Sequence, residues 1–298
     1  MPAMTRRGFV QTAGALAAAA VAAPARAHSP PSAKAPPRFR LGIVTYMVAA
    51  DWDLPTILKV CQRVGIADVE LRTTHKHGVE PSLSKEQRQS VRKQFGDAGM
   101  TPWGLGTTCE FQSPDRAVVK RNIETCKQFI DLARDIGARG VKVRPNGLPK
   151  EVPAEKTLEQ IGKAFIPCGQ AAADAGVEVW VEVHGGGTSK PANMKAIMDH
   201  CGHKAVGVTW NSNAEDVVDG SVAPSFALLK PWLLSCHINH LYNDAAGTYP
   251  YRELFRLLRE SGYDRPTLCE VHKGMPTPES GEEFLRYYKA LWAELARA

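Results

Sequence analysis

Short apolar runs rich in β-branched residues recur along the chain from Leu41 onward, and each is followed by a longer stretch with helical periodicity. Successive runs end about 30 residues apart, which is the length of one strand–helix unit. Eight runs fit this spacing, and their last residues are Tyr46, Arg72, Gly106, Arg144, Glu182, Trp210, His237 and Glu270. Strands that alternate with helices predict a parallel sheet.

The stretches between the runs carry signals for helix ends. Ser84, followed by Gln87, has the pattern of a capping box, and residues 115–136 predict a helix that stops at Gly137. Residues 41–298 make 258 positions, close to the roughly 250 of a (β/α)₈ barrel. We therefore predict a single-domain α/β TIM barrel over 41–298. An open, doubly wound sheet is the alternative, although no G-x-G-x-x-G motif follows the first run.

Residues 1–27 predict a cleaved export signal. An Arg6-Arg7 pair precedes an alanine-rich apolar run, and Ala25-Arg26-Ala27 has the small-x-small form of a cleavage site. The run is shorter than the roughly 20 apolar residues that span a bilayer, so we expect no stable membrane insertion after cleavage. Residues 28–40 predict a Pro-rich linker.

The leader resembles a twin-arginine signal in its sequence Thr-Arg-Arg-Gly-Phe-Val at residues 5–10. The resemblance implies export by the twin-arginine machinery and a periplasmic or secreted location. It also implies that the protein folds, with any metal inserted, before it is exported.

The net charge of +6 comes entirely from the first 40 residues, which hold six basic and no acidic side chains. Residues 41–298 balance 31 basic against 31 acidic groups, which argues against a nucleic-acid partner. The seven cysteines include no C-x-x-C pair, so neither a zinc ribbon nor a full disulfide framework is indicated.

Polar residues end the last four predicted strands. They are Glu182, followed by His184; Asn211; His237; and Glu270. Active sites of TIM barrels lie at the C-terminal ends of the strands, and neighbouring strands are about 4.8 Å apart. We therefore expect these four side chains to converge on one ion.

From Leu41 to its end the chain resembles the xylose-isomerase-like barrels of the sugar phosphate isomerase/epimerase superfamily. Glu182 with His184 matches the E-x-H signature of these barrels, while His237 and Glu270 match the histidine and the closing glutamate. The resemblance implies one divalent metal ion, Mn²⁺, Mg²⁺, Co²⁺ or Zn²⁺, held by Glu182, Asn211, His237 and Glu270. Asn211 departs from the usual aspartate and removes one negative charge, and Asn213 is the fallback ligand.

The same resemblance implies a metal-dependent sugar isomerase or epimerase that acts through an enediolate on a small carbohydrate. Glu182 and Glu270 are then the acid/base pair as well as ligands. Arg144, His184 and His240 are candidates for substrate binding, with His240 at a position where the superfamily often has aspartate.

Three other functions stay open. A lyase of the same architecture would cleave keto-glycosides by metal-assisted elimination, and a silent barrel would only bind sugar or metal. An apurinic-site endonuclease would need more metal ligands and a basic surface. The sequence does not indicate the oligomeric state.

Overall fold

A computed structural model of the chain describes residues 37–297. The predicted signal peptide, the twin-arginine motif and most of the predicted linker lie outside this range. The first strand begins at Arg40, one residue before the predicted start of the barrel.

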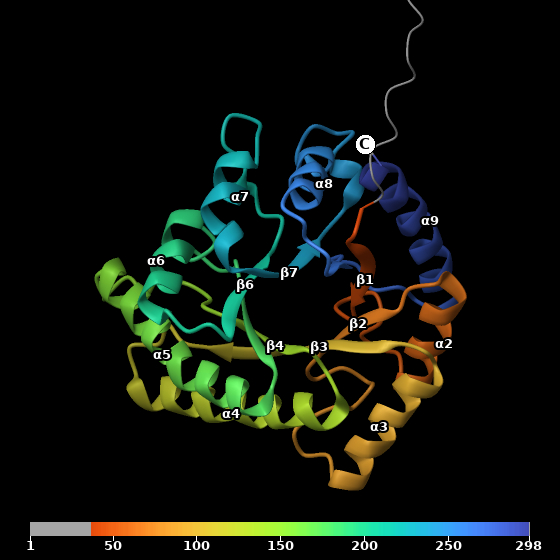
Figure 1. The fold of residues 1–298 in the computed structure, drawn as a ribbon, viewed down its shortest axis with the longest axis horizontal. Helices are drawn as coiled ribbons and strands as arrows, with labels where there is room; N and C mark the ends of the chain where they lie inside the picture. The colour runs from red at the N-terminus through yellow and green to blue at the C-terminus, as the bar shows by residue number, and fades with distance from the viewer. Residues whose placement is uncertain (1–36, 298) are drawn as a thin grey trace, which may run out of the picture. The chain divides into compact units, whose positions relative to one another are not determined.

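Eight parallel strands form a closed barrel, each paired with the next along the chain, and β8 (Pro266–Cys269) pairs back onto β1 (Arg40–Val44). The helices lie outside the strands as a ring (Figure 1). Closure confirms the predicted TIM barrel and excludes an open sheet.

The remaining strands are β2 (Asp68–Arg72), β3 (Thr101–Glu110), β4 (Gly140–Arg144), β5 (Glu178–Glu182), β6 (Val206–Trp210) and β7 (Leu233–Ile238). The helices are α2 (Leu54–Val64), α3 (Lys85–Asp97), α4 (Arg116–Ile136), α5 (Ala154–Ala175), α6 (Pro191–Cys201), α7 (Ala223–Leu229), α8 (Tyr251–Glu260) and α9 (Pro278–Arg297). Short 3₁₀ turns occupy Ala214–Asp216, Lys230–Trp232 and Leu241–Asn243. Among the helices of residues 37–297, none is both long and apolar enough to span a bilayer.

Local sequence signals place several of these ends correctly. Ser84 caps α3 with the full capping box, and α4 ends at Gly137, whose φ of 79° is left-handed. The third strand is longer than predicted: it runs past Gly106 to Glu110, which pairs with Arg144 of β4. That extension brings Glu110 to the C-terminal mouth of the barrel.

The barrel interior is plugged by a compact apolar cluster of Val44, Trp103, Trp180 and Leu268. The two indole rings stack with their centroids 5.5 Å apart. Gly140 lies directly against this cluster, since a Cβ built there would lie 2.5 Å from the Trp180 ring. The missing side chain on β4 therefore makes room for the tryptophan of β5. The apolar plug forms a water-excluding floor for whatever lies above it.

The C-terminal helix closes the ring of helices. α9 (blue) lies beside α2 (orange) in Figure 1, and Lys289 donates from Nζ to the backbone oxygens of Val64 and Gly65 at 2.7 and 2.8 Å. These bonds satisfy two carbonyls at the C-terminal end of α2. The end of the chain is thus tied to its first helix.

We predict that Gly140→Ala lowers the free energy of unfolding by about 1–3 kcal/mol, because the new methyl group overpacks the Trp180 ring. Gly96→Ala is the matched control. Gly96 lies within α3, and among residues 37–297 no atom other than its chain neighbours and nearby helix backbone lies within 4 Å of its built Cβ, so the change should leave stability unchanged or raise it slightly. Urea unfolding of the three proteins measures the difference. Equal stability of Gly140→Ala and the wild type would contradict the packing described here.

Candidate active site

Above the apolar plug, five ionisable side chains point into the barrel. They are Glu70, Lys142, Glu182, His237 and Glu270, and each residue is at most 7% exposed. Glu70, Lys142, Glu182 and His237 lie on β2, β4, β5 and β7. Glu270 follows β8 directly, with its backbone N–H donated to the Ile238 carbonyl. So many buried charges persist only when they compensate one another.

His237 is the centre of this group. Its Nε2 lies 3.2 Å from Oε2 of Glu70, and its Nδ1 lies 3.2 Å from Oε2 of Glu270 and 3.9 Å from Oε1 of Glu182. Burial alone would lower the pKa of His237, but the Glu270 and Glu70 carboxylates outweigh burial and raise this pKa to about 10. Without a bound cation the imidazole is therefore protonated at neutral pH.

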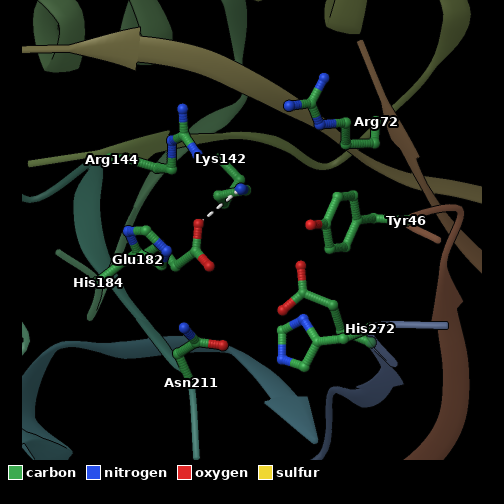
Figure 2. Close-up of a pocket in the computed structure, with 9 residues that line it drawn as sticks. Tyr46, Arg72, Lys142, Arg144, Glu182, His184, Asn211 and His272 are labelled. Carbon is green, nitrogen blue, oxygen red and sulfur yellow. Dashed lines mark hydrogen bonds and ion pairs between the residues drawn. The ribbon is translucent and has the colours of Figure 1, made fainter. Parts of the chain in front are cut away.

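Lys142 supplies the other positive charge. Its Nζ lies 2.6 Å from Oε2 of Glu182, and this ion pair is the dashed line in Figure 2. Burial works to lower the pKa of Lys142, but the carboxylates of Glu182, Glu70 and Glu270 outweigh burial and raise it. The side chain is thus a buried ammonium. Glu182 offers one oxygen to Lys142 and turns the other toward His237.

A cavity of about 120 Å³ opens onto this group. Figure 2 shows side chains from opposite sides of the barrel converging on it. Its lining consists of Tyr46, Arg72, Lys142, Arg144, Glu182, His184, Asn211, Glu270 and His272. A ligand in this cavity contacts both acidic and basic groups.

A hydrogen-bond network holds part of the cavity wall. Oε1 of Glu110 accepts from Arg144 and from Asn146, both at 2.6 Å. Oδ1 of Asn146 lies 2.8 Å from Nδ1 of His184. The extension of β3 to Glu110 is thus what fixes the positions of Arg144 and His184.

The structure brings most of the residues proposed from sequence to one place. Glu182, His237 and Glu270 each offer a ligand atom, and these atoms lie within 4.8 Å of one another. Asn211, Arg144 and His184 line the same cavity.

Two other residues proposed from sequence lie elsewhere. His240 is not among the residues that line the cavity: its ring packs beside Tyr242 and beside His272, which does line it. Asn213 donates from Nδ2 to the Val183 carbonyl at 2.6 Å, so its amide supports the backbone of the loop after β5.

One member of the charged group was not expected from the sequence. Lys142 was not singled out, although a lysine between two valines of a barrel strand is a signal for a charge that points inward. Glu70 also sits in an apolar run, and its role beside His237 follows only from the distance between β2 and β7 side chains.

Comparison with known proteins identifies the family of the fold. A profile described as "Xylose isomerase-like TIM barrel" matches residues 58–291, most of the chain. The chain belongs to the xylose isomerase-like TIM barrel family. No curated protein matches it significantly in sequence.

Several solved structures share the fold of this xylose isomerase-like barrel. One is an L-ribulose 3-epimerase, with a TM-score of 0.71, 17% identity and coverage of 87% of this chain and 96% of the other. Another is a D-psicose 3-epimerase studied with D-fructose, with a TM-score of 0.72, 15% identity and coverage of 87% and 100%. A third is an IolI protein with a bound zinc atom, with a TM-score of 0.67, 16% identity and coverage of 87% and 98%.

The donor set of this xylose isomerase-like barrel fits a divalent cation. Ligands about 2.0–2.2 Å from an ion lie no more than about 4.4 Å apart, and Nδ1 of His237 is 3.2 and 3.9 Å from the nearest oxygens of Glu270 and Glu182. Glu70 faces the opposite ring nitrogen, as the carboxylate partner of a ligating histidine commonly does. Carboxylate oxygens and an imidazole nitrogen suit Mn²⁺, Co²⁺ and Zn²⁺.

The raised pKa of His237 predicts how stability depends on pH when metal is removed. Folding stabilises the protonated imidazole, so this contribution is complete below the ordinary value of 6.5 and is lost as the pH rises toward about 10. In the presence of a chelator, the difference in unfolding free energy between wild type and His237→Gln should therefore shrink from pH 7 to pH 10.

Urea unfolding at several pH values measures this difference. His200→Gln, at an exposed position near the end of α6, is the control and should show a constant difference from wild type. A wild-type advantage over His237→Gln that stays constant, or grows, with pH would contradict a protonated His237.

Proposed function

We propose that this protein is a divalent-metal-dependent sugar isomerase or epimerase that removes a proton from the carbon next to a sugar carbonyl. The observation that carries the proposal is the convergence of Glu182, His237 and Glu270 at the bottom of a cavity at the C-terminal end of the barrel. Three buried ligand atoms from three different strand ends form a site that local structure alone does not require. The sugar epimerases among the similar structures support the same reaction class.

In this proposal the ion is held by Oε1 of Glu182, Nδ1 of His237, a carboxylate oxygen of Glu270 and the amide oxygen of Asn211. When bound, a divalent cation polarises the sugar oxygens and makes the adjacent C–H more acidic. Glu70 accepts the remaining ring proton of His237 and so orients the imidazole toward the other ligands.

Glu182 and Glu270 are proposed as the acid/base pair. They approach His237 Nδ1 from β5 and from the end of β8, so a sugar held above them has one carboxylate near each face. One carboxylate takes the proton and the other returns it to the opposite face, which inverts the configuration. Arg144 and His184, already held by Glu110 and Asn146, are proposed to bind sugar hydroxyls. His240, whose ring lies beside that of His272, is proposed as a further substrate-binding residue.

The proposed substrate is a small carbohydrate, since the cavity measures only about 120 Å³. We also propose that the protein is exported through its twin-arginine leader to the periplasm or beyond. Export favours an unphosphorylated sugar. The leader lies outside the described residues, so this part of the proposal rests on the sequence.

The reaction class can be tested by solvent exchange. We expect Mn²⁺-loaded protein to bind about one ion per chain and to exchange a C–H proton of a ketose for deuterium from D₂O, measured by elemental analysis and NMR. Glu182→Gln and Glu270→Gln should lower exchange at least about 100-fold. Glu124→Gln, at an exposed position on α4, is the control.

Three results would contradict the proposal. The protein could bind no ion, both glutamine variants could exchange at the wild-type rate, or a keto-glycoside could lose its aglycone while free sugars stay unchanged. The last result would identify the lyase instead.

Replacing Asn211 by the aspartate that the superfamily usually has tests whether residue 211 coordinates the ion. Asn211→Asp should raise the affinity for Mn²⁺ about tenfold, because it adds a negative charge beside the ion. The matched control is Asn213→Asp. The Asn213 side chain is turned toward the Val183 carbonyl, so this variant should show no gain in Mn²⁺ affinity. Titration against a chromophoric chelator measures both. Equal affinities of Asn211→Asp and wild type would place residue 211 outside the coordination shell.

A further inference from the structure

Lys142 is a buried ammonium whose hydrogen-bonding capacity is not used up by the protein. The residue is 4% exposed, and among residues 37–297 its Nζ makes one hydrogen bond, to Oε2 of Glu182. An ammonium has three N–H donors. Since Lys142 also lines the cavity, the two remaining donors are available to a molecule that fills it.

The position of Lys142 is fixed by its strand. Its carbonyl accepts a hydrogen bond from Oγ1 of Thr107 at 2.8 Å, and its backbone pairs in register with Trp180, two residues before Glu182. Glu182 therefore lies on the same inner face, two residues beyond the partner of Lys142, and the lysine side chain extends along the barrel to meet it. The ammonium is therefore held in place before any ligand binds, as electrostatic catalysis requires.

Charge compensation explains why Lys142 is paired with Glu182, but it does not explain why the ammonium also lines the cavity. A buried ion pair contributes little net stability, and apolar residues of similar volume commonly replace one without loss. Lys142 instead brings a positive charge to a site whose proposed cofactor is also a cation. A carboxylate that faces both the ammonium and the metal ion is shared between them, so the two cations compete for its negative charge.

Glu182 is that shared ligand. Its Oε2 is bonded to Lys142, while its Oε1 faces Nδ1 of His237 at 3.9 Å. A substrate oxygen bound beside Glu182 would therefore be within reach of the ammonium as well as of the proposed metal position. Figure 2 shows Lys142 and Glu182 meeting at the cavity, with Asn211 on the opposite side of Glu182 from Lys142.

We propose that Lys142 is a catalytic residue that donates a hydrogen bond from Nζ to the substrate oxygen that becomes negative when the C–H bond breaks. This inference rests on the proposed function and assigns one more group to the same site. In the step, the proton leaves carbon for a glutamate, and the C–H electron pair moves so that negative charge gathers on the carbonyl oxygen. Lys142 keeps its proton and stabilises that oxygen through the hydrogen bond.

Two effects of opposite sign test the proposal. Lys142→Met should lower kcat for deuterium exchange at least about 100-fold, with a smaller change in KM, because it removes a donor to the transition state. The same variant should bind Mn²⁺ at least about tenfold more tightly, because a competing positive charge beside Glu182 is gone. Lys142→Arg keeps the charge and should bind Mn²⁺ like the wild type.

The control is Lys93→Met. Lys93 is an exposed lysine of α3 whose one ion pair within residues 37–297 is with Asp97 on the same helix, so kcat and Mn²⁺ affinity should both be unchanged. Binding of a sugar hydroxamate, an analogue of the enediolate, gives a readout independent of turnover. Calorimetry should show it binding at least about tenfold more weakly to Mn²⁺-loaded Lys142→Met than to Mn²⁺-loaded wild type.

A purely structural lysine would give other results. The inference about Lys142, but not the proposed function, would be overturned if Lys142→Met lost metal affinity and kcat together. It would also be overturned if this variant matched the wild type in exchange and in hydroxamate binding. A wild-type protein that neither exchanges a sugar proton nor binds the hydroxamate would instead overturn the proposed function, and the role of Lys142 with it.

Discussion

The balance of charge inside the upper barrel is the constraint on which the rest of this structure depends. Three carboxylates, an ammonium and an imidazole lie together in a space closed below by stacked tryptophans. In such surroundings no charge persists unpaired, so His237 takes up a proton between Glu70 and Glu270, and Lys142 pairs with Glu182. A divalent cation could take over the role of the imidazole proton, which links metal binding to protonation.

Several features of the fold hold this charged group in position. Glycine on β4 admits the Trp180 ring, and the ring seals the barrel beneath the site. The extra length of β3 carries Glu110 to the mouth, where it holds Arg144 and Asn146. Helix caps at Ser84 and Gly137 set where each chain segment returns to the barrel. Rigid strands therefore present the side chains, as accurate positioning requires.

Glu182 connects the proposed chemistry to the unusual features of this chain. Its two oxygens face different cations, the ammonium of Lys142 and the proposed metal position beside His237. Asn211 carries no negative charge, and Lys142 contributes a positive one near the proposed ligands. Both residues favour negative charge on a bound substrate over tight binding of the ion, which suits a reaction that passes through an oxyanion.

The sequence by itself determined the barrel and the strand ends that carry Glu182, His237 and Glu270, because strand–helix spacing and polar residues at the ends of apolar runs are local signals. Only the tertiary structure decided which other side chains lie beside these three residues. Lys142 and Glu70 lie inside apolar runs, and the side chains that they meet on other strands are decided only when the barrel closes. His240 lies two residues beyond the end of β7 and packs beside His272, because loop geometry beyond the strand is set by contacts distant in sequence.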